Sequence, residues 1–346
     1  MPDTKQWVVI GAGPAGIAAL GAILDKGISA QDVAWIDPHF AAGDFGQLWS
    51  GVTSNTKAGL FTRFLHQCDS YGYGTAPDFS LARLDPEKTC YLGDMRDPLL
   101  WVTEQLRYQC QAIQAKAQQL TNHSQGWQIH LDNGDSVVSE NVVLALGADE
   151  KTLSYPDVQV MSLQQVLNEN TVQDHFSPED TVAVFGSSHS AIIALRHLTD
   201  MPVKQVINFY QSSLKFAVYM DDWILFDNTG LKGNTAVWAR EHLNGNEPKN
   251  LLRVFSNKEN IAHHLPLCNK AVYCVGFASR TIPVEGVPVV DHDPHTGIIA
   301  PGLFGVGIGF PELKTDPYGH QEHSVGLWKF MDYLHRVLPL WMKYSR

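Results

Sequence analysis

The sequence predicts an α/β fold with two Rossmann-like dinucleotide-binding domains, one of them inserted into the other. A strand, a glycine-rich turn and a helix follow one another at about Trp7–Lys26 and again at about Thr181–Thr199. Such units imply parallel sheets with helices on their faces. Two late apolar segments, AVYCVGF and GLFGVGIGF, are typical of strands that belong to the first sheet. We therefore expect the second unit to interrupt the first.

The length of 346 residues fits two domains. We assign the first to residues 1–150 plus 272–346 and the inserted one to residues 151–271, with an irregular insertion at about 211–250. This insertion lacks clean periodicity, which is typical of a lid. We also predict a helix near Pro98–Ala117, a hairpin turned by the letters DNGD, and a closing helix from about Glu322 to Leu338.

Composition argues against several classes of protein. Asp and Glu number 36 against 25 Lys and Arg, for a net charge of -11, which repels nucleic acids and anionic lipids. No apolar run approaches the length of a membrane span. A strand that begins almost at the N-terminus leaves no room for a signal peptide, so we expect a cytoplasmic protein. The five cysteines form no C-x-x-C pair and no zinc-site spacing, which predicts reduced thiols and no metal.

The first glycine-rich turn predicts a dinucleotide site. Gly11, Gly13 and Gly16 form G-x-G-x-x-G, with Pro14 and Ala15 inside it, directly after an apolar strand and before a helix. The first glycine permits a tight turn, the second lets the backbone approach a pyrophosphate, and the third lets helix and strand pack closely. The phosphates then meet the free N–H groups at the start of the helix.

An acid stands where the ribose of such a nucleotide would lie. The strand Val33–Ile36 ends in Asp37, 21 residues after Gly16. The Asp37 carboxylate is placed to accept both hydroxyls of an adenosine ribose, and it would repel a 2′-phosphate.

The second turn, VAVFGSSHSA, keeps Gly186 and places Ser187, Ser188 and Ser190 where glycines might be expected. Small hydroxyl residues permit close approach and can donate to phosphate, but serine is also a common helix N-cap. The next strand, Val203–Phe209, ends without an acid. This absence favours NADPH over NADH.

Lys215 lies close to that strand end and is a candidate for the phosphate contact, although an ordinary surface lysine has the same appearance. His189, inside the second turn, is expected to be solvent-exposed, as a histidine at a helix start commonly is.

The segment GQLWSGVTSNTKAGLF resembles a region of class B flavin-containing monooxygenases. There, a Gly-Gly-x-Trp element precedes a Ser/Thr-Asn-Thr stretch, and GSSHSA is similar to the second nucleotide motif of the same family. The matching positions in this region are Gly46, Trp49, Ser54, Asn55, Thr56 and Lys57.

The resemblance implies FAD as the resident cofactor and NADPH as its reductant. It also implies a flavin C4a-hydroperoxide that oxygenates sulfur or nitrogen of a small substrate with O₂. Asn55 would lie beside the flavin ring, because an amide donates and accepts without supplying an acidic proton. A loop asparagine in an Asx turn is the alternative. Gln47, Trp49 and Gly307 would contact the cofactor.

The chain also departs from the family pattern. Gln47 replaces the second glycine of Gly-Gly-x-Trp, and Pro156–Phe185 lacks the Phe-x-Gly-x-x-x-His fingerprint. The Gly-Asp of disulfide reductases is absent near Gly307, and so is their C-x-x-C, which excludes a thiol-based redox cycle. These gaps leave two alternatives open, a flavin reductase or oxidase without an oxygenated product, and a non-catalytic flavoprotein that binds a ligand or partner.

Two C-terminal features complete the prediction. His320, with Glu322 and His323, has a spacing that suits a metal, but we favour a role in covering the flavin from a helix N-terminus. The helical stripe that follows is typical of core or of a homodimer contact, and it comprises Trp328, Phe330, Met331, Leu334, Leu338 and Trp341.

Overall fold

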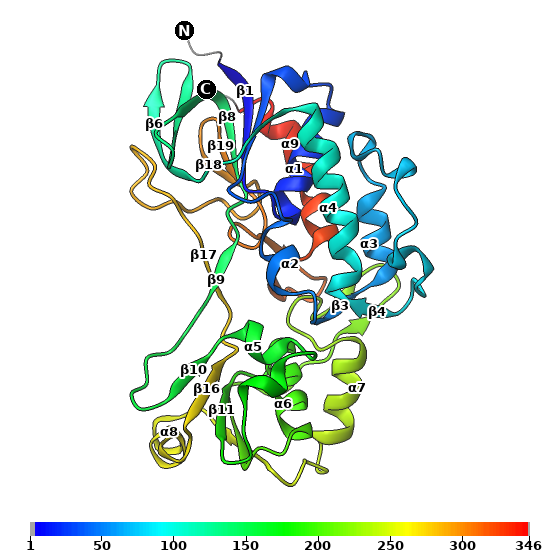
Figure 1. The fold of residues 1–346 in the computed structure, drawn as a ribbon, viewed down its shortest axis with the longest axis vertical. Coiled ribbons are helices and arrows are strands. Elements are labelled where there is room, and N and C mark those ends of the chain that lie inside the picture. The colour runs from blue at the N-terminus through cyan, green and yellow to red at the C-terminus, as the bar shows by residue number, and fades with distance from the viewer. Residues whose placement is uncertain (1–3, 345–346) are drawn as a thin grey trace.

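The computed structural model describes residues 4–344 and contains two parallel sheets, stacked end to end along the long axis of the molecule (Figure 1). Residues 159–273 build the lower sheet, and the chain before and after them builds the upper one. The prediction of an α/β fold with one unit inserted into the other is confirmed.

The first sheet has eight strands. Its main path runs β18-β19-β8-β1-β2-β5, and the neighbours from β19 to β5 are parallel, as in doubly wound nucleotide-binding folds. The hairpin at DNGD is confirmed, because β7 and β8 pair antiparallel on either side of it. The bounds are β1 (Lys5–Ile10), β2 (Val33–Ile36), β5 (Gln111–Ile113), β6 (Ala117–His123), β7 (Gly126–Leu131), β8 (Ser136–Leu144), β18 (Ile298–Ala300) and β19 (Leu303–Gly305).

The second sheet has five strands, all parallel, in the order β10-β16-β11-β12-β15. The strand predicted at Thr181–Phe185 and the helix after it are confirmed as β11 and α6 (His189–Asp200). The other elements are β10 (Gln159–Met161), β12 (Gln205–Tyr210), β15 (Leu251–Phe255), β16 (Lys270–Tyr273), α5 (Leu163–Leu167) and α8 (Lys258–His264).

One late strand is in a different sheet from the one predicted. AVYCVGF forms β16, which pairs with β10 and β11 of the second sheet, whereas GLFGVGIGF supplies β19 of the first. The strand therefore straddles the predicted boundary at residue 272. Both segments are equally apolar, and long-range pairing rather than local pattern decides which sheet each one joins.

The chain crosses between the sheets twice, side by side. β9 (Ala148–Glu150) and β17 (Phe277–Ser279) pair antiparallel in the middle of the molecule (Figure 1). Arg280 closes this crossing, because its Nη2 lies 2.8 Å from carboxylate oxygens of both Asp44 and Asp149.

Helices α1 (Pro14–Asp25), α4 (Leu92–Gln109) and α9 (Leu327–Trp341) cover one face of the first sheet (Figure 1). α4 begins six residues before the predicted helix start, because Asp94 caps the backbone N–H of Tyr91 at 3.1 Å and Pro98 is tolerated inside. Its predicted end is also wrong, since residues 111–113 form β5. Shorter elements of this part are α2 (Gly43–Leu48), α3 (Ala58–Leu65), β3 (Thr53–Lys57) and β4 (Thr89–Tyr91).

The closing helix begins five residues later than predicted. Glu322 belongs to β21 (Gln321–Ser324), which pairs with β20 (Glu312–Thr315), and α9 follows. The stripe on α9 is core, because Phe330, Met331, Leu334, Leu338 and Trp341 are all buried against the first sheet. Among residues 4–344, no helix combines the length and apolar character needed to cross a bilayer.

The insertion at 211–250 is more regular than predicted. It holds a small hairpin, β13 (Val218–Tyr219) with β14 (Ile224–Leu225), and a ten-residue helix, α7 (Gly233–His242). α7 buries Ala236 and Ala239 in the core of the second sheet. Because the buried side chains are few and small, the sequence of this segment shows little helical periodicity.

Candidate active site

A cavity of about 2280 Å³ runs between the two sheets, lined by residues from both parts of the chain. Pockets for single drug-sized ligands have volumes of roughly 300–1,000 Å³, so this cavity has room for more than one ligand. Both glycine-rich turns open into it. Twelve of the predicted site residues line the cavity, namely Gly11, Gly13, Pro14, Ala15, Asp37, Gln47, Trp49, Asn55, Ser188, Ser190, Gly307 and His320.

The three glycines of the first turn have different reasons to be glycine. Gly11 has a φ of +108°, and a Cβ there would lie 2.3 Å from the carbonyl oxygen of Ala145. A Cβ on Gly16 would lie 1.9 Å from the Gly11 oxygen, so this glycine allows the helix to pack on the strand. A Cβ on Gly13 would meet nothing closer than 3.9 Å. Protein packing does not require glycine at residue 13, and the open space beside it fits a bound pyrophosphate.

Asp37 lies at the end of β2 and holds the same turn. Its Oδ2 accepts the backbone N–H of Ala12 at 2.7 Å, and its Oδ1 accepts those of His39 and Phe40 at 2.8 and 2.7 Å. The carboxylate is nearly buried but still borders the cavity. A carboxylate offers about four acceptor positions, so one remains for a ribose hydroxyl.

The second turn has the same form. Gly186 has a φ of +125°, and a Cβ there would lie 2.4 Å from the carbonyl oxygen of Cys274. Ser188 is the N-cap of α6 but makes no capping side-chain hydrogen bond, and it borders the cavity together with Ser190. Gly186 and Ser187 lie behind this surface, and the Ser187 Oγ is 3.2 Å from that of Ser212. The N-terminus of α6 therefore points its free N–H groups into the cavity.

His189 is the first residue of α6, and the expectation that it is solvent-exposed is wrong. Both of its ring nitrogens are buried, and neither makes a hydrogen bond of good geometry within residues 4–344. Burial and the nearby charge of Lys232 lower the pKa of His189 to about 4, and the backbone of Thr53 opposes this only weakly. The imidazole is therefore neutral near pH 7. Two unsatisfied nitrogens on a cavity wall fit a polar ligand.

Asn55 lies in β3 and lines the cavity. Its side chain is exposed to the cavity, and its Oδ1 accepts the hydroxyl of Thr56 at 3.2 Å. Because residues 53–57 form a strand, Asn55 does not close an Asx turn. Trp49, nearby, packs against the core of the second sheet and so forms part of the seam between the two sheets.

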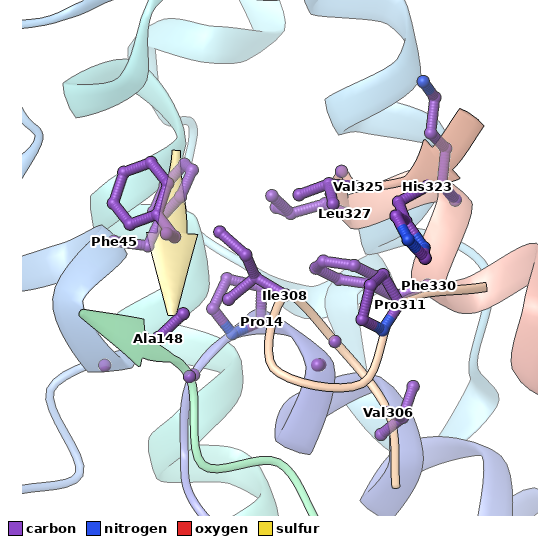
Figure 2. A pocket seen from close by; sticks show the side chains of 18 of the residues that line it. Pro14, Phe45, Ala148, Val306, Ile308, Pro311, His323, Val325, Leu327 and Phe330 are labelled. Carbon is purple, nitrogen blue, oxygen red and sulfur yellow. The ribbon is translucent and has the colours of Figure 1, made fainter. Parts of the chain in front are cut away.

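The part of the cavity near the start of α9 has several apolar side chains on its wall. Figure 2 shows Pro14 from α1, Phe45 from α2 and Ile308 from the loop after β19 on one side. Leu327 and Phe330 from the start of α9 lie opposite them. Leu327 and Phe330 are buried. This part of the cavity offers a surface that a flat, largely apolar ring system can occupy.

Lys215 borders neither this cavity nor a smaller one beside it. Its ammonium lies 5.0 Å from the centre of the Phe226 ring. His320 lies in the turn between β20 and β21, not at a helix N-terminus as predicted, and its ring meets Phe226 edge-on at 5.0 Å. No group of three or more metal-binding side chains occurs in the described part of the chain.

Sequence reasoning missed a set of polar contacts, called the latch below, that joins the insertion to the C-terminal elements β21 and α9. Glu322 of β21 accepts the backbone N–H groups of Asn228 and Thr229 at 3.0 and 3.2 Å, and also the Thr229 hydroxyl. Lys329 of α9 lies 2.8 Å from Asp227. Burial acts to raise the pKa of Asp227, but Lys329 and Lys232 outweigh it and hold that pKa below its usual range. This latch joins residues about 100 positions apart, and no local signal in the sequence marks it.

Several known proteins are similar to this chain in sequence or in fold, and most of them are monooxygenases. A monooxygenase named AgnR1, from Paecilomyces divaricatus, is 35% identical over 389 aligned positions that cover 99% of each chain. A flavin-containing monooxygenase from Stenotrophomonas maltophilia has a TM-score of 0.64 at 15% identity, and an ornithine N-hydroxylase from Kutzneria sp. 744 has 0.66 at 14%. Thioredoxin reductase from Lactococcus lactis has 0.58 at 12%. Each of these three solved structures covers 99% of this chain and is covered to 99% itself. No protein-family model matches.

The two sheets and the shared cavity have the two-dinucleotide-binding-domain fold of these solved structures. The chain belongs to the monooxygenase family that includes AgnR1. The predictions of a monooxygenase family and of an oxidoreductase are confirmed.

Proposed function

We propose that this protein is an FAD-dependent monooxygenase, reduced by NADPH, that oxygenates sulfur or nitrogen of a small substrate through a flavin C4a-hydroperoxide. One observation carries the proposal, the opening of two glycine-rich turns from two separate sheets into the same cavity. A cavity shared in this way lets a reductant bound on one sheet meet an acceptor bound on the other.

FAD fits the sheet built from the two ends of the chain. The open space at Gly13 and the helix start behind it would hold the pyrophosphate, and the free acceptor position of Asp37 would take a ribose hydroxyl. The part of the cavity near the start of α9, with Ile308 and Phe330, would hold the flavin ring. Bound there, the flavin supplies the electron transfer and the activation of oxygen.

NADPH fits the inserted sheet, with its phosphates at Ser188 and Ser190. The neutral imidazole of His189 can either donate or accept a hydrogen bond, so it suits the amide or ribose hydroxyls near the nicotinamide end. The latch formed by Glu322 and the 227–229 segment holds the insertion over the cavity and limits the access of water.

Asn55 fits the role of orienting the reacting centre. Its amide faces the cavity from β3, between the two turns, and can donate a hydrogen bond without an acidic proton. The ion pair of Lys57 and Glu87, 2.7 Å apart, lines the same cavity. We propose a small polar substrate and O₂ as the partners, and, since all five cysteines are free thiols, a cytoplasmic location.

One observation favours a second candidate, an NADPH oxidase that releases hydrogen peroxide. The Asn55 side chain is exposed, which admits water to the position where oxygen would react. Product stoichiometry separates the two candidates. With small sulfides and amines present, a monooxygenase converts most of the NADPH consumed into oxygenated product, whereas an oxidase yields one peroxide for each NADPH throughout.

A further inference from the structure

A second cavity, of about 350 Å³, lies at the carboxyl end of β12, between that strand, the loop after it and α7. It is distinct from the large cavity. Two arginines of different elements line it, Arg240 from α7 and Arg253 from β15. The remaining lining residues are Tyr210, Ser213, Leu214, Phe216, Ala239, Leu243 and Asn244.

Both guanidinium groups are held in place by aromatic rings. The Cζ of Arg240 lies 4.2 Å from the centre of the Phe216 ring, and that of Arg253 lies 4.9 Å from the centre of the Tyr210 ring. A guanidinium stacked on a ring keeps its N–H groups free at its edges for an anion.

Neither arginine has a carboxylate within 4.0 Å in the described part of the chain. Burial lowers the pKa of Arg253, whereas Tyr210 and Glu247 act to raise it. An anion bound in this pocket would meet both guanidinium groups. A phosphate monoester has the charge and the oxygen atoms to pair with both.

The pocket is connected to the second glycine-rich turn through Asn208. The fully buried Nδ2 group of Asn208 donates to the carbonyl oxygens of Val184 and Gly186 at 3.0 and 2.9 Å. Its Oδ1 accepts from the Nε of Arg253 at 3.1 Å. The side chain of Asn208 therefore fixes the position of Arg253 relative to the turn.

A dinucleotide on this turn would place its adenosine ribose at the end of the next strand, β12. Ser212 and Ser213 follow that strand. Ser212 lies 3.2 Å from Ser187 of the turn, and Ser213 lines the arginine pocket. The ribose and the pocket are thus neighbours.

We propose that Arg240 and Arg253 bind the 2′-phosphate of NADPH and set the preference for NADPH over NADH. The inference rests on the proposed NADPH site of the inserted sheet. Lys215 does not take part, because Leu214 and Phe216 on either side of it face the pocket while its own ammonium lies over Phe226.

The test measures binding of NADP⁺, NAD⁺, 2′,5′-ADP and inorganic phosphate to the FAD-loaded protein by calorimetry. It compares the wild type with Arg240→Ala, Arg253→Ala and the double variant, and Lys215→Ala serves as the matched control. Each arginine variant should weaken NADP⁺ and 2′,5′-ADP by roughly 10- to 100-fold, the scale of a charge-assisted hydrogen bond, and leave NAD⁺ unchanged. The Lys215 variant should bind all four as the wild type does.

Equal FAD content and melting temperature in all variants establish that they are folded. A wild type that prefers NADP⁺, together with arginine variants that keep this preference, would overturn the pocket assignment alone. Binding of inorganic phosphate but not of 2′,5′-ADP to the arginines would overturn it too. A wild type that binds neither NADP⁺ nor 2′,5′-ADP would contradict the proposed reductant, and the pocket assignment with it.

Discussion

The carboxylate of Asp37 accepts a hydrogen bond from the backbone N–H of Ala12, with an O–N distance of 2.7 Å. This contact ties the end of β2 to the middle of the first glycine-rich turn. The acid therefore shapes the turn in addition to offering an acceptor to a ribose. Both roles depend on an oxygen atom at the same place.

We predict that Asp37→Asn weakens FAD binding roughly 10- to 150-fold. The amide has one acceptor oxygen in place of two and carries no charge, and a hydrogen bond to a charged group is worth about 1.5–3 kcal/mol. Titration of the apoprotein with FAD, followed by flavin fluorescence, gives the dissociation constant. Glu140→Gln, on the exposed side of β8, is the control and should bind as the wild type does. Equal affinity in the Asp37 variant would remove this residue from the FAD site.

Alanine at Gly13 should affect mainly FAD binding, and alanine at Gly16 should affect mainly the stability of the fold. The Gly13 variant should fold, losing on the order of 1 kcal/mol at the helix N-cap, and should fail to retain FAD. The Gly16 variant should be strongly destabilised, because its Cβ would lie 1.9 Å from the Gly11 oxygen. Thermal unfolding and the flavin-to-protein ratio distinguish the two effects. A yellow, fully loaded Gly13 variant would show that no phosphate approaches there.

The sequence predicts the parts of the site that depend on local chemistry. The turn at Gly11–Gly16, the acid at Asp37 and the bounds of β11 follow from glycine spacing and strand pattern alone. The burial of His189 does not, because it results from β3 lying across the start of α6. The arginine pocket is equally hidden, since Arg240 of α7 and Arg253 of β15 line the same cavity only in the folded chain.

His189 should make stability depend on pH. Its folded-state pKa of about 4 lies below its ordinary value of 6.5, so the unfolded chain binds a proton more readily. The free energy of unfolding should therefore fall as the pH drops from about 6.5 towards 4, by an amount of the order of 3 kcal/mol. Urea unfolding at pH 7.5 and pH 5 measures the part of this loss that falls between the two pH values, about 2 kcal/mol.

His189→Gln should reduce the difference between the two pH values, whereas His335→Gln, at an exposed position of α9, should leave it unchanged. The same His189 variant should also bind NADP⁺ more weakly. If both variants keep the wild-type difference, His189 titrates normally and its assigned environment is wrong.

The Asn55→Ala variant should retain FAD but release more hydrogen peroxide. The phosphate and ribose contacts lie at other residues, so flavin content should not change. If FAD and NADPH cover Asn55 when they bind, deletion of its hydrogen bond to the reacting centre costs about 1–3 kcal/mol, so peroxide release should become roughly 5- to 150-fold faster. The measurement is hydrogen peroxide formed per NADPH oxidised. Asn55→Asp should be no better than alanine, because an ionised carboxylate cannot donate. Unchanged peroxide yields in both variants would make Asn55 a wall residue only.

Rapid mixing of the NADPH-reduced protein with O₂ tests the central claim most directly. The proposed monooxygenase should form an absorbing flavin C4a–oxygen adduct before oxidised flavin returns. The adduct should decay faster when a reactive sulfide or amine is added, with oxygenated product appearing in step. Direct return of oxidised flavin, with one peroxide released per NADPH whether or not a substrate is present, would contradict the account and leave an oxidase in its place.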